Sequence, residues 1–259
     1  MKHPGRCWEA NARAWTLLSR QGYDVYRDHV NTPAFFQLLP DVNGLAGLDI
    51  GCGEGHNTRQ LVRRGAVMTA VDIAPAFVRF AREFEEREPC QIEYLAADAL
   101  ALPFRSRQFA FAAASMSLMD VGEPERALQE ACRVLRPGGF LQFSILHPCF
   151  MPPHRRLVRD GDGTVKAVEV GRYFECIDGE IDRWIFSAAP PEVQAQFPLF
   201  EVPRFHRTLS QWLNAIIDAG FVVERVLEPA AGEETARRVP AVADTRVCGY
   251  FLHVRCRKP

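Results

Sequence analysis

Hydrophobic residues at helical spacing open the chain. An amphipathic helix is predicted near the N-terminus, where apolar positions recur every three or four residues: Trp8, Ala12, Trp15 and Leu18. A second, shorter helix is expected over residues 32–39, because Pro33 suits the first turn of a helix. Together the two helices predict an N-terminal helical cap over residues 1–44.

Short apolar runs then alternate with amphipathic stretches. Strands are predicted for the apolar runs at residues 45–50, 66–71, 92–96, 109–114 and 140–146. The stretches between them predict helices over residues 56–64, from Pro75 onward and over residues 124–135. Strands that alternate with single helices imply right-handed crossovers and a parallel sheet covered on both faces. The chain is therefore predicted to be an α/β protein with its core over residues 45–146.

The alternation stops between residues 147 and 207. This stretch carries two Pro-Pro pairs and many aromatic residues, so it is too apolar for a linker and too long for a bare loop. We expect it to be a folded insertion over one edge of the sheet. Residues 208–259 then predict a helix over 208–219 and two closing strands of the core sheet, at 221–227 and 248–255.

Composition and charge narrow the function classes. The 259 residues carry 31 Lys and Arg against 32 Asp and Glu, a net charge of −1, which gives no general attraction to nucleic acid or to anionic membranes. The eight cysteines are scattered without a C-x-x-C pair, which disfavours a zinc site or a redox motif. No apolar run reaches the length of a signal peptide or a membrane span, so we expect a cytoplasmic protein with reduced thiols.

A glycine cluster follows the first predicted strand, in Leu48-Asp49-Ile50-Gly51-Cys52-Gly53-Glu54-Gly55. Glycines let the backbone turn sharply at a strand end and let a ligand approach main-chain amides. Asp72 ends the next strand 21 positions after Gly51, close to the ~20 expected for a carboxylate that receives ribose hydroxyls. The strand, the turn, the helix and the spaced acid together predict a nucleoside site at the carboxyl edge of the sheet.

The spacing of the glycines bears on which nucleoside is bound. A pyrophosphate fingerprint has the pattern G-x-G-x-x-G, whereas here the third glycine comes one residue early and Glu54 lies inside the turn. The charge of Glu54 is expected to repel a pyrophosphate but not a cationic sulfonium. A nicotinamide dehydrogenase is therefore disfavoured.

These motifs, taken in order, resemble the class I S-adenosylmethionine-dependent methyltransferases, in particular the small-molecule, ubiquinone-biosynthesis-like group of methyltransferase type 11. The resemblance covers about residues 45–146. The matching segments are Leu48 to Gly55, Val71 to Ile73, Ala97 to Ala99, Leu102 to Phe104, Ser115 to Asp120 and Arg133 to Gly139.

The resemblance implies a Rossmann-like, doubly wound sheet of seven strands with the last strand antiparallel. It implies S-adenosylmethionine as cofactor and S-adenosylhomocysteine as product. Asp72 would bind the ribose, Ile73 would pack on the adenine, and Asp98 would accept from the adenine amino group. Tyr26 lies in the segment that closes over the cofactor in relatives, and its ring could contact the sulfonium. The residues expected to bind the cofactor are Gly51, Cys52, Gly53, Asp72, Ile73, Asp98, Ala99, Ser115, Met116 and Tyr26.

Methyl transfer is an in-line displacement of an activated leaving group, so alignment and exclusion of water can do most of the work. A base is needed only if the acceptor arrives protonated. His147 follows the fifth strand directly and is the first candidate for that base, with His206 as the second; either could instead only hydrogen-bond the backbone. No set of metal ligands is complete around His147, so no metal is expected.

The sequence therefore predicts an enzyme that methylates an O, N or C atom of a small, partly apolar acceptor. Arg155, Arg156 and Arg159 could hold an anionic substrate, or they could form a solvated basic turn. Two alternatives stay open: a methyltransferase acting on tRNA or protein, and an S-adenosylmethionine-binding protein without catalysis. No nucleic-acid or membrane partner is expected, and the sequence does not indicate an oligomeric state.

Overall fold

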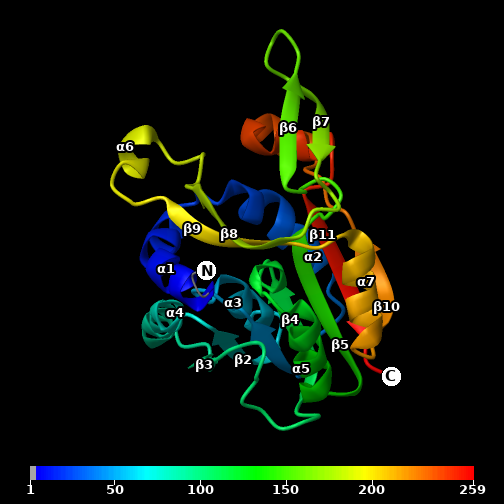
Figure 1. The fold of residues 1–259 in the computed structure, drawn as a ribbon. Coiled ribbons are helices and arrows are strands. Elements are labelled where there is room, and N and C mark those ends of the chain that lie inside the picture. The colour runs from blue at the N-terminus through cyan, green and yellow to red at the C-terminus, as the bar shows by residue number, and fades with distance from the viewer. Residues whose placement is uncertain (1–3) are drawn as a thin grey trace.

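A seven-stranded sheet forms the centre of the computed structural model, which describes residues 4–259 (Figure 1). The strand order is β10-β11-β5-β4-β1-β2-β3. The strands are β1 (Ala46–Ile50), β2 (Val67–Asp72), β3 (Glu93–Ala96), β4 (Phe109–Ser115), β5 (Leu135–Leu146), β10 (Val222–Leu227) and β11 (Phe251–Arg257). β11 pairs antiparallel with both β5 and β10, whereas the pairs from β5 to β3 are parallel. The predicted α/β, Rossmann-like sheet with an antiparallel last strand is confirmed.

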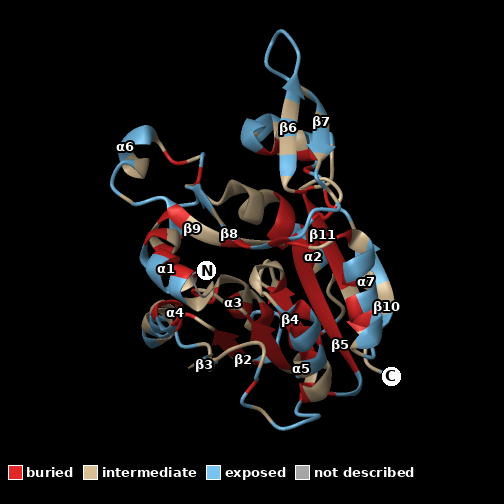
Figure 2. Ribbon diagram, in the orientation of Figure 1, coloured by how far each residue is buried: buried red, intermediate tan, exposed pale blue. Residues whose placement is uncertain are grey.

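Helices cover both faces of this sheet. The helical elements are α1 (Pro4–Arg20), the π-helix η1 (Arg27–Asn31), α2 (Thr32–Leu38), α3 (His56–Val62), α4 (Pro75–Arg87), the short 3-10 helix η2 (Leu118–Asp120), α5 (Pro124–Val134), α6 (Pro191–Gln194), α7 (Leu209–Asp218), α8 (Glu233–Arg238) and the 3-10 helix η3 (Pro240–Arg246). α5 and α7 pack on one face of the sheet, and α2, α3 and α4 pack on the other. The sheet strands between them are largely buried (Figure 2).

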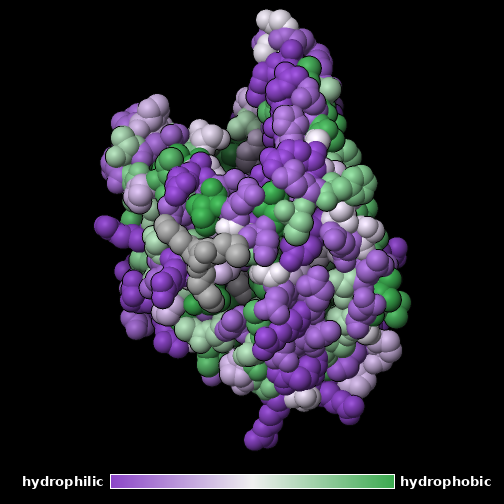
Figure 3. All heavy atoms as spheres, in the orientation of Figure 1, coloured by the Kyte–Doolittle hydropathy of each residue, from purple (hydrophilic) through white to green (hydrophobic). Residues whose placement is uncertain are grey.

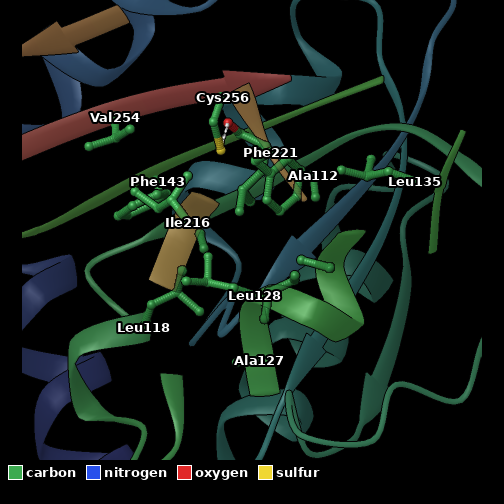
Figure 4. Close-up of a cluster of buried hydrophobic side chains, with 14 of the residues drawn as sticks. Ala112, Leu118, Ala127, Leu128, Leu135, Phe143, Ile216, Phe221, Val254 and Cys256 are labelled. Atoms are coloured by element: carbon green, nitrogen blue, oxygen red, sulfur yellow. Dashed lines mark hydrogen bonds between the residues drawn. The ribbon is translucent and has the colours of Figure 1, made fainter. Parts of the chain in front are cut away.

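The local sequence explains where the helices begin. Pro75 and Pro124 occupy the first turns of α4 and α5, where a missing backbone N–H costs nothing. The Thr208 side chain caps α7 by accepting from the backbone N–H of Gln211, and the Gln211 side chain accepts from the backbone N–H of Thr208 in return. The buried faces of α5 and α7 then join β4, β5 and β11 in a single apolar cluster (Figure 4).

The stretch over residues 147–207 folds into two hairpins. β6 (His154–Arg159) pairs with β7 (Val165–Gly171), and this hairpin projects from the body of the protein with a mostly hydrophilic surface (Figures 1 and 3). β8 (Ile177–Trp184) pairs with β9 (Phe200–His206). β9 lies against α1, where the Asn11 side chain donates to the Glu201 carbonyl at 2.9 Å and accepts from the Glu201 backbone N–H at 3.0 Å.

Two local features differ from the sequence pattern. β5 begins at Leu135, five residues before the strand predicted at residues 140–146, and its pairing with β4 shifts register between Leu135 and Phe140, where Gly138 and Gly139 lie. Between the two closing strands, the polar segment forms α8 and η3. No helix in the described part of the chain has the length and apolar character needed to cross a membrane.

Candidate functional site

A cavity of about 540 Å³ lies at the carboxyl ends of β1, β2 and β4. We call it the sheet-edge cavity. Of the ten residues expected to bind a cofactor, nine line it: Gly51, Cys52, Gly53, Asp72, Ile73, Asp98, Ala99, Ser115 and Met116. The topology thus brings together residues that are spread over more than sixty positions of the chain. The volume of the sheet-edge cavity is within the range of small-molecule sites.

The glycine loop uses its own amides to hold its shape. The backbone N–H groups of Gly51 and Cys52 both donate to the carbonyl of Val71, at 2.8 and 2.9 Å. The N–H of Gly53 donates to Asp72 Oδ2 at 2.8 Å. Gly51 has a φ of +74°, and a Cβ there would lie 2.3 Å from the Cβ of Ser117, so only glycine fits. With these three amides engaged, the loop offers no row of free donors for a pyrophosphate.

Two carboxylates face the sheet-edge cavity from neighbouring strand ends. Asp72 is buried and accepts from the N–H groups of Gly53 and Ala74, one on each oxygen. Burial raises the pKa of Asp72 to about 6, so it is ionised at neutral pH. Asp98 accepts the Leu100 N–H on Oδ1 at 2.9 Å. Because a carboxylate oxygen has two lone pairs, both side chains keep acceptor capacity for hydroxyl or amino groups of a ligand.

Glu54 has a different role from the one its position suggests. Its carboxylate is buried and accepts hydrogen bonds from Arg20 on α1 and from Arg59 on α3, with shortest N···O distances of 2.8 and 3.0 Å. It does not line the sheet-edge cavity. The expectation that its charge acts on a ligand in the glycine loop is therefore wrong, and the engaged amides supply the argument against a pyrophosphate instead.

A second cavity, of about 530 Å³, lies between the N-terminal segment, the β8–β9 hairpin and β11. We call it the aromatic cavity because its wall includes many rings: Trp8, Trp15, Tyr23, Tyr26, Trp184, Phe186, Phe205, Trp212, Tyr250 and Phe251. Five residues line both cavities, namely Trp8, Trp15, Met116, Asp120 and Phe205. The two cavities therefore adjoin along a shared wall. Met116 in that wall has a φ of +56°, a strained conformation of the kind that concentrates at functional sites.

Tyr26 does not belong to the sheet-edge cavity, in contrast to the prediction. It lines the aromatic cavity, where its ring stacks on Tyr250 at a centroid distance of 5.4 Å. Its hydroxyl group donates to the backbone carbonyl of Ala241 at 2.8 Å and lies 3.0 Å from the carboxylate of Asp244. The aromatic residues that reach the sheet-edge cavity from the N-terminal segment are Trp8 and Trp15.

His147 is placed away from both cavities. Nδ1 accepts from the backbone N–H of Cys149 at 3.1 Å, so the ring proton is on Nε2, which donates to Glu228 at 2.6 Å. The ring is buried and packs against Phe150. With both nitrogens engaged and no place on either cavity wall, His147 has the geometry of a structural residue and not of the base that the sequence suggested.

His206 lies in the wall of the aromatic cavity. Its Nε2–H donates to the backbone carbonyl of Tyr173 at 2.7 Å, which leaves Nδ1 as an acceptor. Burial lowers the pKa of His206, so the ring is neutral at pH 7. His206 does not line the sheet-edge cavity.

The three arginines of the basic segment separate in space. Arg156 pairs with Glu169, and Arg159 donates to the carbonyl of Gly163, both within the projecting hairpin. Arg155 alone of the three lines the aromatic cavity. Its guanidinium carbon lies 4.3 Å from the centroid of the Tyr250 ring, and Nη2 donates to the Tyr250 hydroxyl. The segment is thus a largely solvated strand and not a turn, with one cation directed into the aromatic cavity.

Sequence reasoning missed Trp8, Trp15 and Asp120 as site residues. The two tryptophans are seven positions apart and so lie on one face of α1, a spacing that also fits ordinary core packing. Asp120 follows the fourth strand at the carboxyl edge of the sheet, which was a usable signal.

A buried hydrogen-bond chain supports the wall at Ser115. Asn31 Nδ2 donates to Ser115 Oγ at 3.2 Å, and Asn31 Oδ1 accepts from His253 Nε2 at 2.8 Å. Asn31 ends the π-helix η1, so the irregular turn ties the N-terminal segment to β4 and β11.

Comparison with known proteins places this arrangement among methyltransferases. Residues 48–143 match the family described as "Methyltransferase domain". The demethylmenaquinone methyltransferase of Renibacterium salmoninarum is 34% identical over 140 residues, which are 50% of this chain and 56% of that protein. The malonyl-[acyl-carrier protein] O-methyltransferase of Salmonella typhimurium is 33% identical over 153 residues, 57% of this chain and 59% of that protein. The chain thus spans less than two thirds of these curated relatives.

The solved structures agree over a longer stretch. An S-adenosylmethionine-dependent methyltransferase from Mesorhizobium loti superimposes with a TM-score of 0.70 at 27% identity, covering 87% of this chain and 96% of that one. A Listeria monocytogenes protein described as a putative methyltransferase of the same kind has a TM-score of 0.71 at 20% identity, covering 88% and 96%, and shows the shared fold.

Proposed function

We propose that this chain, which belongs to the class I S-adenosylmethionine-dependent methyltransferases, transfers a methyl group from that cofactor to a small, partly apolar acceptor. The observation that carries the proposal is the pair of adjoining cavities. One holds the predicted cofactor residues and the other is lined by aromatic rings. Because the two cavities share lining residues, a cofactor in one and an acceptor in the other would be neighbours, as direct transfer requires.

The residues of the sheet-edge cavity fit the cofactor. Asp72 has acceptor capacity for the two ribose hydroxyls, and Asp98 has it for the adenine amino group. Gly53 leaves open space where a side chain would begin, since a Cβ there would meet nothing within 4 Å. When bound, S-adenosylmethionine supplies a methyl group activated by a positively charged sulfur. The rings of Trp8 and Trp15 at the shared wall offer faces to that charge.

The aromatic cavity is proposed as the acceptor site. Its rings would hold an apolar or planar body and exclude water from the reacting atoms. A few polar groups stand among them, including Arg155 and the neutral His206, and these would orient the acceptor. The apolar wall and the inward cation favour an acceptor with a ring or chain and a polar end.

Binding and turnover test this function separately. Calorimetry with S-adenosylmethionine, S-adenosylhomocysteine and NAD should show binding of the first two and not of NAD. Release of S-adenosylhomocysteine is then followed with a panel of aromatic amines, phenols and carboxylic acids. Tighter binding of NAD than of S-adenosylhomocysteine would overturn the proposal. Binding without turnover across the panel would favour the non-catalytic alternative.

A further inference from the structure

Asp120 stands at the boundary between the two cavities. It ends η2, directly after β4, and lines both the sheet-edge cavity and the aromatic cavity. The other residues of the shared wall are Trp8, Trp15, Met116 and Phe205, so Asp120 is the one ionisable side chain among them. Its carboxyl group therefore lies close to the boundary across which a group would be transferred.

The carboxyl group of Asp120 has no partner among the residues that the structure describes. Within residues 4–259 no side chain or backbone N–H donates to it, and no cation pairs with it; only the backbone N–H of Asp120 is engaged, with the Ser117 carbonyl at 3.1 Å. By contrast, Asp72 and Glu54 nearby are each held by two donor groups. Asp120 is half-buried, and a carboxylate with reduced access to water and no partner is costly, so a partner from a ligand would relieve that cost.

The surrounding charges do not supply that partner. β9 and α5 pack against η2. Of the charged or titratable groups on these elements and just after β9, those that line the aromatic cavity together with Asp120 are Arg204, His206 and Arg207. The other charged groups are Glu201 on β9, which pairs with Arg183, and Glu125, Arg126, Glu130 and Arg133 on α5. Arg204 pairs with Asp182, and Arg207 donates to the Gly122 carbonyl and lies 3.9 Å from Glu125. β5 also meets η2, near Leu146, and from Phe140 to that end it has no titratable side chain. Burial alone raises the pKa of Asp120 well above its ordinary value.

We propose that Asp120 is the catalytic base, ionised when a sulfonium cation arrives at the shared wall and then able to take the proton of an N–H or O–H acceptor. This inference rests on the proposed function and narrows the acceptor to amines and hydroxyl compounds. In the free protein, burial raises the pKa of this carboxyl group and so favours its protonated form. The sulfonium supplies a positive charge that the described residues do not pair with this carboxyl group. Cofactor binding therefore favours the ionised carboxylate, which is the form that can accept a proton.

Proton transfer to Asp120 accompanies the transfer of the methyl group. The N–H or O–H bond of the acceptor breaks, and its proton moves to an oxygen of the Asp120 carboxylate. The electron pair of the acceptor atom forms the new bond to the methyl carbon. The pair of the breaking carbon–sulfur bond stays on sulfur, which becomes a neutral thioether. Asp120 is again the neutral acid that its environment favours.

His206 serves this step less well. It lines only the aromatic cavity and is held by its Nε2–H, so it contacts the acceptor side alone. Asp120 contacts both sides, which matters because the base must reach the acceptor atom at the point of transfer.

Proton release on cofactor binding tests the inference without a known acceptor. Calorimetry in two buffers of different ionisation enthalpy gives the number of protons released per ligand, measured between pH 6 and 8. At its maximum, S-adenosylmethionine should release up to about one proton more from the wild type than from Asp120→Asn. S-adenosylhomocysteine, which lacks the charge, should show no such difference. Asp120→Glu should keep the release, and so should the control Glu88→Gln, which alters an exposed carboxylate that lines neither cavity.

Each result decides one question. Equal proton release from the wild type and Asp120→Asn across this pH range would overturn the inference, even if both ligands bind. Failure of both ligands to bind the wild type would instead overturn the proposed function. If Asp120→Asn does not fold, loss of the release in Asp120→Glu as well would count against the inference. With any acceptor that the wild type methylates, Asp120→Asn should lower the rate by about 10²–10⁴-fold while S-adenosylhomocysteine still binds.

Discussion

Arg20 and Glu54 connect the N-terminal helix to the glycine loop: Nε and Nη2 of Arg20 lie 2.9 and 2.8 Å from the same oxygen, Oε2, of Glu54. Arg59 reaches that oxygen from α3 at 3.0 Å. One buried carboxylate therefore receives two cations from opposite sides. Because α1 also carries Trp8 and Trp15 into both cavities, this contact fixes the helix that closes the site.

Loss of the Glu54 carboxylate and loss of its partly exposed partner Arg20 should differ in their effect on stability. Glu54→Leu leaves the buried Arg59 without its counter-charge and should lower the free energy of unfolding by about 3–5 kcal/mol. Arg20→Met removes a partly exposed partner while the Glu54–Arg59 pair remains, so its cost should be about 1 kcal/mol or less. Urea denaturation of both variants measures the difference, and equal losses would contradict this account.

Asp72→Asn should weaken binding of S-adenosylhomocysteine by about 1.5–3 kcal/mol, the range for hydrogen bonds to a charged group. The amide keeps one oxygen for a loop N–H, so the fold should survive. Calorimetry of the folded variant gives the dissociation constant, with the exposed Asp41→Asn as the matched control. An unchanged constant for Asp72→Asn would place the ribose elsewhere.

Trp8→Leu should distinguish the charged cofactor from its neutral product. Trp8 lies in the shared wall, so its loss removes a ring face from the sulfonium but only apolar surface from S-adenosylhomocysteine. We expect an extra loss of about 0.5–2 kcal/mol for S-adenosylmethionine. The ratio of the two dissociation constants is the measurement, and an unaltered ratio would show that Trp8 does not meet the charge.

His147→Ala should affect stability and not catalysis. The substitution removes the contacts with Glu228 and Cys149 and should lower the free energy of unfolding by about 1–3 kcal/mol. Cofactor affinity and the rate of methyl transfer should stay as in the wild type, because the ring reaches neither cavity. A rate loss of 10²-fold or more in a folded variant, the size typical of a lost base, would restore His147 to the reaction.

Because Asp49 is buried, we expect the free energy of unfolding to depend on pH. Its carboxyl group is buried beneath the glycine loop and accepts from the Thr58 hydroxyl group at 2.6 Å; burial raises its pKa to about 7 from 3.8. Between pH 3.8 and about pH 7, Asp49 holds a proton in the folded state that it has released in the unfolded state. Its contribution to the free energy of unfolding therefore falls as pH rises, by up to about 1.4 kcal/mol per pH unit.

The variant Asp49→Asn isolates that contribution from the other titrating groups. Its stability relative to the wild type should increase as pH rises from about 4 to about 7 and then level off. Chemical denaturation at several pH values gives the difference. A difference that is constant with pH would mean that Asp49 is ionised in the folded protein.

Local patterns were sufficient to predict the sheet and most of the sheet-edge cavity. The glycine loop, Asp72 and Asp98 are each fixed by a strand end beside them, and parallel strands bring their ends to one edge. The backbone path alone therefore places these side chains.

Residues whose direction depends on distant partners were not predictable in this way. His147 turns toward Glu228, which is 81 positions away, and Tyr26 turns toward Tyr250 and Asp244 at the far end of the chain. Glu54 turns toward Arg20 rather than toward the ligand. In each case a contact between remote segments decides the orientation of the side chain, and the spacing of nearby residues in the sequence does not predict that contact.

The antiparallel β11 has a consequence for how the chain folds during synthesis. β10 pairs only with β11 within the described sheet, and the outer edge of β5 is covered only by β11. As the ribosome releases the chain, both edges stay open until residues 251–257 have emerged. Until then the nascent protein exposes strand edges that could pair with other chains, so the sheet is completed only when β11 is available to pair.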